Sequence, residues 1–348
     1  MLNQRQQSCG GGGRSGRVRL AHTYDDIISV DNLLEAWQEF VRGKRTKPDV
    51  QEFQFRLMDN ILALHRDLKS GEYRHGPYHA FKINDPKPRD IHKASARDRL
   101  VHHAIYRILY PFFDRIFIHD SYSCRVDKGT HLAMATFRSY AAKVSHNHTR
   151  TVWVLKSDIK KFFASIDHQI LKDILATRIP DSRILSLLAS VIDSFAQVKP
   201  AEGRVGLPLG NLTSQLLVNI YMSEFDQWVK HHLKEKHYLR YADDFVILSH
   251  DRSHLTGRIP QIKRFLVDRL HLTLHPKKVS ISTFACGVDF LGWMHFQDHR
   301  VLRTSTKRRA FRNCAGREEG SAVVQSYLGL LKQGNAEKIC ADVKSRLA

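Results

Sequence analysis

The sequence predicts an α+β fold from three observations: helical periodicity at both ends of the chain, β-rich runs in the middle, and a composition suited to a folded core. The chain has 348 residues, of which 42% are hydrophobic. That length is enough for two or three compact subdomains with buried cores. There are neither internal repeats nor a clear linker, so we expect helices and a hairpin first, a sheet next and helices last.

A basic, glycine-rich segment opens the chain, and helical spacing of apolar residues follows it. Residues 1–22 contain "CGGGGRSGR" and are expected to form a flexible tail. Two helices come next, the second ended by Gly71, because glycine commonly closes a helix. Short β-like runs flank a Pro- and Lys-rich turn in residues 78–95, which predicts a basic hairpin. A further helix is expected to start near residue 96 and to run up to Pro111.

The middle of the chain alternates between strand-like and helix-like patterns. Residues 151–159 are β-rich and apolar, and helical spacing returns in residues 168–178. A turn containing Gly and Pro then leads into a long amphipathic helix, and the stretch "HYLRYADDFVILSHD", residues 237–251, is typical of a hairpin. A helix near residues 258–270 and a short β-pair in "VDFLGWMHF" follow. The remaining residues are basic and mostly helical in pattern.

The composition favours an enzyme with a nucleic-acid partner. Lys and Arg number 55 against 35 Asp and Glu, which gives a formal charge of +20. Such a surplus repels itself in the folded state, so a polyanionic partner is expected. The five cysteines are scattered and never spaced as CxxC, which argues against a disulfide framework or a Cys-rich zinc site and favours a reducing cytoplasm. No apolar run approaches membrane-spanning length, so no membrane contact is expected.

Adjacent carboxylates at the tip of the 237–251 hairpin need an explanation, because each raises the cost of ionising the other. Asp243 and Asp244 lie there, and Asp158 ends an earlier β-rich run. If the two strands are neighbours, the three carboxylates converge, and bound Mg²⁺ would relieve their repulsion. The alternative is an ordinary solvated turn. "TYDDII", residues 23–28, has a similar composition but no framing strands, and we expect a surface turn before a helix there.

Six segments in order resemble the motifs of reverse transcriptases, over roughly residues 80–300. They are "RDIHKASARDRLVHHAI", "SYSCRVDKGTHLA", "KSDIKKFFASIDH", "YADD", "LTLHPKKV" and "VDFLGW". The resemblance implies a right-hand polymerase fold with fingers, a palm of antiparallel sheet plus helices, and a small helical thumb. The expected parts are the tail in residues 1–22, the N-terminal helices and fingers in 23–150, the palm in 151–296 and the thumb in 297–348.

The resemblance also implies an activity and a set of site residues. The expected activity is RNA-directed DNA synthesis from dNTPs on an RNA template, through an RNA/DNA duplex, with two Mg²⁺ ions that Mn²⁺ can replace. Catalysis is expected at Asp158, Asp243, Asp244 and Lys278, and metal binding at Asp158, Ile159, Asp243 and Asp244. In this family the Lys is thought to protonate departing pyrophosphate. Nucleotide contacts are expected at Arg89, Phe163, Leu209, Gly210 and Gln215, and template or primer contacts at Arg97, Arg125, Leu291, Gly292 and Trp293.

One aromatic residue bears on which nucleotide is used. Phe163 lies five residues after Asp158, where reverse transcriptases carry a bulky aromatic that would collide with a ribose 2′ hydroxyl. Adjacent side chains on a strand or bend point to opposite faces, so one of Phe162 and Phe163 is expected to fill the core. We assign Phe163 to sugar selection and Phe162 to the core.

The segment "LPLGNLTSQ", residues 207–215, indicates the kind of reverse transcriptase. Group II intron and retron enzymes usually read P-Q-G-x-x-x-S-P here, whereas Leu209 replaces the Gln and Gln215 replaces the Pro. The G-x-x-x-S-Q form resembles enzymes of diversity-generating retroelements, whose cDNA synthesis is error-prone at template adenines. That resemblance implies a cytoplasmic enzyme, encoded by a bacterium or phage, that works with a small basic accessory protein and a structured retroelement RNA. The alternatives are a defence-type or retron-like reverse transcriptase and a non-catalytic, maturase-like RNA-binding protein.

Overall fold

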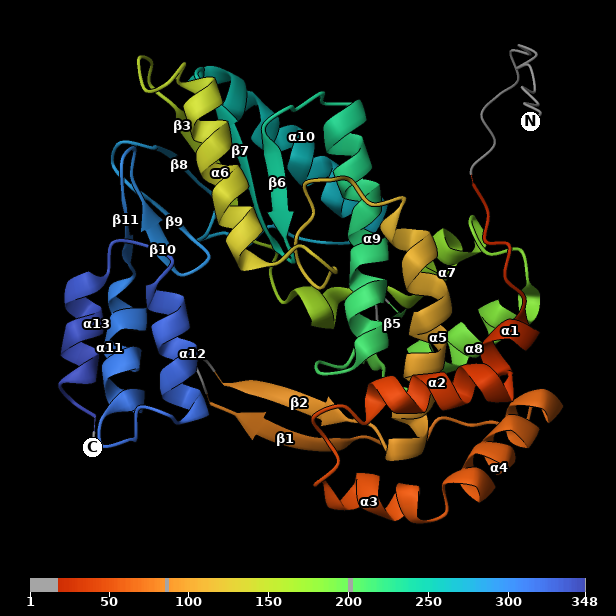
Figure 1. Ribbon diagram of the computed structural model, residues 1–348. Coiled ribbons are helices and arrows are strands. Elements are labelled where there is room, and N and C mark those ends of the chain that lie inside the picture. The colour runs from red at the N-terminus through yellow and green to blue at the C-terminus, as the bar shows by residue number, and fades with distance from the viewer. Residues whose placement is uncertain (1–17, 85–87, 200–202, 348) are drawn as a thin grey trace, which may run out of the picture.

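The computed structural model describes residues 18–84, 88–199 and 203–347 (Figure 1). This part of the chain begins with helices. The first four are α1 (Tyr24–Ile28), α2 (Val30–Phe40), α3 (Pro48–Phe55) and α4 (Leu57–Ser70). Gly71 ends α4 in the left-handed conformation, with φ of 78°, as its place in the sequence predicts.

The predicted N-terminal tail is only partly described, since residues 1–17 lie outside these ranges. Its last residues belong to the fold. Leu20 is buried, and its backbone N–H donates to the carbonyl of Arg178 (2.9 Å). The expectation of a flexible segment up to residue 22 is therefore wrong for Leu20, because an apolar side chain and a backbone hydrogen bond fix it against the helices that follow residue 168.

The predicted basic hairpin is present and leads into a long helix. Its strands are β1 (His79–Ile83) and β2 (Arg89–Lys93), and the helix is α5 (Ala96–Asp114). The expected end of this helix at Pro111 is wrong, because α5 continues to Asp114. A helix-interior proline costs roughly 3 kcal/mol. Leu109 and Phe113, which lie on either side of it, are buried in the core, and their packing offsets that cost.

Four strands form the largest antiparallel sheet among the described residues, in the upper part of the view (Figure 1), and we call it the central sheet. In spatial order they are β6 (Tyr238–Tyr241), β7 (Asp244–Ser249), β3 (Trp153–Ser157) and β8 (Ser280–Thr283). β3 is therefore flanked by strands from two later parts of the chain, β7 and β8. Its residues Val154 and Leu155 are both fully buried, because helices cover both faces of the sheet.

Three long helices cover the two faces of this sheet. α6 (Thr130–Val144) packs on the face that carries Val154, whereas α9 (Leu212–His231) and α10 (Arg252–Leu270) pack on the face that carries Leu155. α10 begins earlier than the sequence predicts. The Asp251 side chain accepts from the backbone N–H of Ser253 (2.7 Å) and caps the helix.

Smaller elements connect the sheet to α9. They are a 3₁₀ helix (Phe162–Ser165), α7 (His168–Ala176), α8 (Ser182–Asp193), β4 (Gln197–Lys199) and β5 (Gly203–Val205). Asp167 caps α7 by accepting from the backbone N–H groups of Gln169 (2.8 Å) and Ile170 (3.0 Å). This cap fixes where α7 begins.

The C-terminal part is a three-stranded sheet followed by three helices. Its elements are β9 (Val288–Phe290), β10 (Trp293–His295), β11 (Arg300–Leu302), α11 (Thr304–Cys314), α12 (Ala322–Leu331) and α13 (Glu337–Lys344). Trp293 is fully buried in the core of this unit. The predicted α+β class, with an antiparallel sheet at its centre, is therefore confirmed. No helix among the described residues combines the length and the apolar character needed to cross a membrane.

Candidate active site

The central sheet places Asp158 beside the hairpin that carries Asp243 and Asp244. β3 and β7 are antiparallel neighbours, and their register pairs the last residue of β3 with the second residue of β7. Asp158 directly follows β3, so it lies at the same end of the sheet as the residue that begins β7. Asp158 is only 8% exposed, and its carbonyl accepts from the backbone N–H of His275 (2.8 Å). The two strands are thus neighbours, as the convergence of the carboxylates requires.

The turn between β6 and β7 consists of Ala242 and Asp243. Tyr241 pairs with Asp244 across the hairpin, which leaves a two-residue connection. Ala242 has a φ of 55°, in the left-handed region. A residue with a Cβ pays about 1 kcal/mol to adopt that conformation, so the surrounding structure has to hold the turn in place.

The two hairpin carboxylates carry charge that the protein compensates poorly. Partial burial, followed by the charge of Asp158, raises the pKa of Asp243 above its ordinary value. Partial burial also raises the pKa of Asp244 to about 6, against the opposing charge of Lys156 and with support from the neighbouring carboxylates. A bound cation would remove the penalty on both groups.

Lys278 and Ile159 lie next to Asp158. The Lys278 ammonium donates to Asp158 Oδ2 (2.7 Å), and its side chain is 44% exposed. Ile159 forms a β-bridge with Leu274, and its side chain is buried in the core. An aliphatic side chain offers no metal ligand, so any metal contact from Ile159 has to come from its backbone carbonyl.

The carboxylates do not form a preassembled cluster of three metal ligands. Within the part of the chain that the structure describes, no three His, Cys, Asp or Glu residues are grouped so that they could hold a metal ion. Asp244 begins β7, and after burial Lys156 has the largest influence on its pKa. Mg²⁺ is usually bound by one or two carboxylates together with substrate phosphates and water. Asp158 and Asp243 fit that requirement, with Asp244 as their neighbour.

The loop before α9 connects the predicted sugar-selection residue to the β1–β2 hairpin. The backbone N–H of Leu207 donates to the carbonyl of Phe163 (2.8 Å). The carbonyl of Leu209 accepts from the backbone N–H of His92 (3.1 Å), and the Asn211 side chain donates to the carbonyl of His92 (3.1 Å). The sequence gives no signal for the roles of His92 and Asn211, because backbone pairing between distant segments leaves no pattern in side-chain chemistry.

Other predicted nucleotide contacts lie around this loop. Phe162 is buried, while Phe163 is partly exposed. Gly210 has a φ of 107°, and a Cβ there would meet Ile91 Cγ2 of β2 at 3.0 Å, so glycine permits the close approach of loop and hairpin. Gln215 is partly exposed in the first turn of α9. Arg89, at the start of β2, is exposed, and its charge opposes the raised pKa of Asp243.

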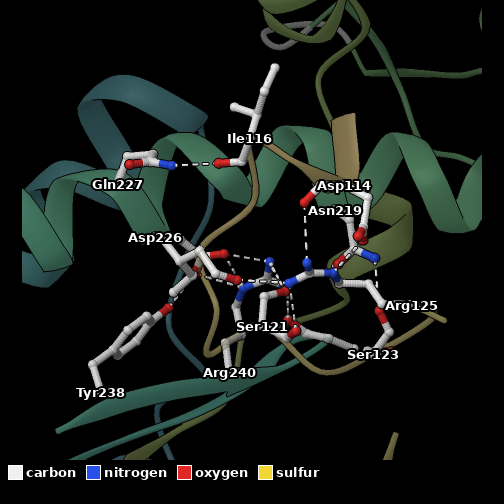
Figure 2. Close-up of polar contacts among 12 residues, drawn as sticks. Asp114, Ile116, Ser121, Ser123, Arg125, Asn219, Asp226, Gln227, Tyr238 and Arg240 are labelled. Atoms are coloured by element: carbon white, nitrogen blue, oxygen red, sulfur yellow. Dashed lines mark hydrogen bonds and ion pairs between the residues drawn. The ribbon is translucent and has the colours of Figure 1, made fainter. Parts of the chain in front are cut away.

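The predicted template and primer contacts lie in different surroundings. Arg97 forms an ion pair with Asp67. The side chain of Arg125 is 5% exposed and donates to Asp114, at the end of α5, and to the carbonyls of Ile118 and Ser121 in the loop after it (Figure 2). These internal partners leave Arg125 poorly placed to meet a template.

The turn "FLGW" has both an accessible and an inaccessible part. Leu291, with a φ of 51°, and Gly292, with a φ of 89°, form the turn between β9 and β10 and are partly exposed. Trp293 is fully buried, and a Cβ on Gly334 would meet its ring at 2.3 Å. Trp293 therefore packs against the C-terminal helices, and only the turn residues before it are free to contact a primer.

A family model described as "Reverse transcriptase (RNA-dependent DNA polymerase)" matches residues 82–295. The match covers more than half of the chain and includes β2, the carboxylate site and the loop before α9. The chain therefore belongs to the reverse transcriptase family of RNA-directed DNA polymerases.

Individual relatives are distant. The chain is 27% identical over 295 residues to Protein YkfC of Escherichia coli, a match that covers 73% of this chain and 74% of that protein. It is 24% identical over 322 residues to the group II intron-encoded protein LtrA of Lactococcus lactis, covering 72% of this chain but 51% of LtrA. A solved structure of apo telomerase from Candida tropicalis, truncated from its C-terminal domain, aligns with a TM-score of 0.48 at 12% identity over 71% of this chain and 60% of that one.

Proposed function

We propose that this chain copies an RNA template into DNA in a reaction that depends on Mg²⁺, with Asp158 and Asp243 as the principal ligands. One observation carries the proposal. Asp158 follows the central strand β3, Asp243 lies in the turn of the adjacent hairpin, and the charge of Asp158 raises the pKa of Asp243. A partly buried carboxylate that lies beside a second carboxylate is suited to bind a cation and costly to ionise without one.

In this reaction the bound Mg²⁺ would activate the attacking 3′ hydroxyl and neutralise charge on the triphosphate. The remaining steps belong to the protein. Asp158 and Asp243 hold their oxygens at the end of the sheet. Lys278, which donates to Asp158, is exposed enough to exchange that partner for a phosphate and to protonate departing pyrophosphate. Arg89, whose charge already influences Asp243, would contact the incoming triphosphate.

Phe163 would select the sugar of the incoming nucleotide. It is partly exposed and bonded through its carbonyl to the loop before α9, whereas Phe162 is buried. A ring at this place would collide with a ribose 2′ hydroxyl, so dNTPs would be preferred. We assign residues 23–150 to the fingers, 151–296 to the palm and 297–348 to the thumb of the polymerase.

We further propose that the enzyme serves a diversity-generating retroelement. Support comes from Leu209 and Gln215 in the loop before α9, which stand where intron and retron enzymes carry Gln and Pro. The Leu209 carbonyl is bonded to β2, so its side chain belongs to a loop held between two parts of the molecule. Copying would then be error-prone at template adenines, with a small basic accessory protein and a structured RNA as partners.

A second candidate follows from the relatives. LtrA is a group II intron-encoded protein, and the chain matches about half of its length. A defence-type, retron-like or intron-type reverse transcriptase would use the same carboxylates, and a maturase-like protein would bind RNA without using them. Copying fidelity distinguishes a defence-type, retron-like or intron-type enzyme from a diversity-generating one. Any primer extension by the chain excludes a non-catalytic, maturase-like protein.

The deciding experiment is primer extension on a defined RNA template with dNTPs and Mg²⁺. We expect full-length cDNA from the wild type and none from Asp158→Asn, because the amide cannot supply the negative charge that the cation requires. A filter-binding measurement with the same primer–template is the control, since the variant should still bind it. Equal extension by wild type and Asp158→Asn would overturn the proposal.

A further inference from the structure

A buried ion pair lies directly behind the turn that carries Asp243. Arg240, in β6, and Asp226, in α9, are each at most 1% exposed. The guanidinium Nε lies 2.8 Å from Asp226 Oδ1, and a terminal nitrogen lies 2.6 Å from Oδ2, which makes a two-pronged contact (Figure 2). The pair thus joins the strand that enters the catalytic hairpin to the long helix that follows the nucleotide loop.

Every N–H of the Arg240 guanidinium has an acceptor. Besides the two bonds to Asp226, one terminal nitrogen donates to Ser121 Oγ (3.1 Å). The other donates to Asn219 Oδ1 (3.4 Å) and to the backbone carbonyl of Ala242 (2.9 Å). A guanidinium has five N–H donors in a fixed plane, so its orientation is fully determined by these acceptors.

The bond to the Ala242 carbonyl bears on Asp243 directly. The carbonyl of Ala242 and the Cα of Asp243 belong to the same planar peptide unit. Holding the carbonyl therefore fixes the plane from which the Asp243 side chain departs. Ala242 needs this support, because its φ of 55° is a conformation that residues with a Cβ seldom adopt.

We propose that Arg240 is a positioning residue, oriented by Asp226, that holds the Ala242–Asp243 peptide and thereby aims Asp243 at the cation. The proposal rests on the proposed function, because it takes Asp243 to be a metal ligand. It differs from a purely structural role in a testable way. A buried ion pair adds little net stability and can often be replaced by apolar side chains of similar volume. A change in the orientation of the Asp243 side chain should therefore be separable from a loss of folding.

The matched variants are Arg240→Lys and Tyr238→Phe. The Tyr238 hydroxyl donates to Asp226 Oδ1 (2.5 Å) and is as deeply buried as Arg240, but it has no bond to the turn. Tyr238→Phe therefore disturbs the same network without releasing Ala242. A lysine keeps the charge opposite Asp226 but lacks the planar fork that reaches Ser121, Asn219 and Ala242 together.

A third variant guards against misfolding of the lysine variant. It is Arg240→Met and Asp226→Leu in the Tyr238→Phe background, which removes both charges and the hydroxyl that would otherwise lack an acceptor. Apolar replacement of a complete buried pair is often neutral for stability. This variant is compared with Tyr238→Phe alone.

Two measurements are needed. The first is Mn²⁺ binding to a complex of the enzyme with dNTP and a primer that lacks its 3′ hydroxyl, followed by electron paramagnetic resonance of the free ion. The second is steady-state primer extension. For Arg240→Lys and for the triple variant we expect Mn²⁺ binding about tenfold weaker and kcat lowered by a similar factor or more, with the dNTP KM nearly unchanged. Tyr238→Phe should shift the melting temperature but leave both readouts within about twofold.

Equal Mn²⁺ binding and equal kcat in all folded variants would overturn the positioning role. So would losses in Tyr238→Phe as large as those in Arg240→Lys, since that result would mean general destabilisation. A wild type that binds Mn²⁺ but extends no primer would contradict the proposed function instead, and the Mn²⁺ comparison among the variants would still decide the role of Arg240.

Discussion

The chain contains two adjacent Asp–Asp pairs that closely follow a Tyr, and their surroundings in the structure are opposite. Asp25 and Asp26 are exposed in the first turn of α1, where Asp26 accepts from the backbone and side chain of Thr23. Those hydrogen bonds lower the pKa of Asp26. Asp243 and Asp244 are partly buried at the central hairpin, and burial with neighbouring carboxylates raises the pKa of each.

The difference teaches what makes an acidic pair a site. At α1 the carboxylates have donors: Thr23 precedes the helix and donates to Asp26, and Arg183 of α8 forms an ion pair with Asp25 (2.9 Å). The expectation of a turn before a helix is wrong in detail, because these residues begin the helix themselves and are stabilised by its N-terminus. At the hairpin, two strands bring a third carboxylate near without enough donors. The pair at α1 is satisfied, whereas burial raises the pKa of both carboxylates at the hairpin, as expected for the cation site proposed above.

The largest test of this contrast is activity after neutralising one member of each pair. Asp243→Asn should lower primer extension by about a thousandfold or more, since it removes a charged ligand for the cation. Asp26→Ala should leave extension unchanged while lowering the free energy of unfolding by about 1 kcal/mol through loss of its bonds to Thr23. Primer extension and urea unfolding of both variants measure the two effects. A comparable activity loss in both would mean that the hairpin pair is not special.

A second test asks whether Phe163 meets the sugar of the incoming nucleotide. Phe163→Ala should raise rNTP incorporation relative to dNTP about tenfold or more, because it removes the ring that would collide with a 2′ hydroxyl. Phe162→Ala should instead lower the free energy of unfolding by about 3–5 kcal/mol, since it empties a buried volume. Single-nucleotide incorporation with matched dNTP and rNTP measures the ratio. A shift in Phe162→Ala without one in Phe163→Ala would reverse the assignment.

The opposite pKa shifts predict opposite effects of pH on stability. The raised pKa of Asp243 and the value of about 6 for Asp244 mean that their ionisation costs stability as pH rises from about 4 through 6. Without metal, Asp243→Asn/Asp244→Asn should therefore be more stable than wild type by about 2 kcal/mol near pH 7.5 and nearly equal near pH 3.5. The lowered pKa of Asp26 contributes stability that is lost only as pH falls below about 4.

Thermal melting of metal-free protein across that pH range, with and without Mg²⁺, measures this prediction. Added Mg²⁺ should raise the melting temperature of the wild type near pH 7.5 and have little effect on Asp243→Asn/Asp244→Asn. If the wild type were instead more stable than the double variant near pH 7.5, that result would contradict the raised pKa values. If Mg²⁺ also left the melting temperature of the wild type unchanged, that result would contradict the cation site.

Much of the frame around the site was predictable, because it depends on local patterns. The β-rich run before Asp158, the hairpin around Asp243 and the glycine that ends α4 all follow from periodicity and turn chemistry. Pairing of the two strands required the structure, although the carboxylates themselves suggested it. The continuation of α5 past Pro111 was not predictable, because tertiary packing of its buried neighbours outweighs a local preference.

The side-chain partners could not be read from the sequence. Lys278 and Asp158 lie 120 residues apart in the chain, and nothing local indicates that they form an ion pair. The motifs assign Arg125 and Trp293 to nucleic-acid contacts by position, yet the structure gives both residues internal partners. Arg240 lies within the hairpin of residues 237–251. Its role becomes visible only when α9 brings Asp226 to it.

The smallest effect we predict concerns fidelity and Leu209. Its carbonyl accepts a hydrogen bond from His92 of β2, and the loop continues into α9, so its backbone is held at both ends of the loop. An aliphatic side chain supplies shape but no hydrogen bond, so correct and incorrect base pairs of similar outline are separated by less free energy. Leu209→Gln should reduce errors at template adenines severalfold, up to about tenfold for each 1.4 kcal/mol of discrimination regained. Sequencing cDNA made by both proteins on one RNA template measures this, with Leu209→Met as the control that changes shape without adding a hydrogen bond. Low and even errors across all four template bases in the wild type would instead favour a faithful reverse transcriptase of the defence or retron type, built around the same carboxylates.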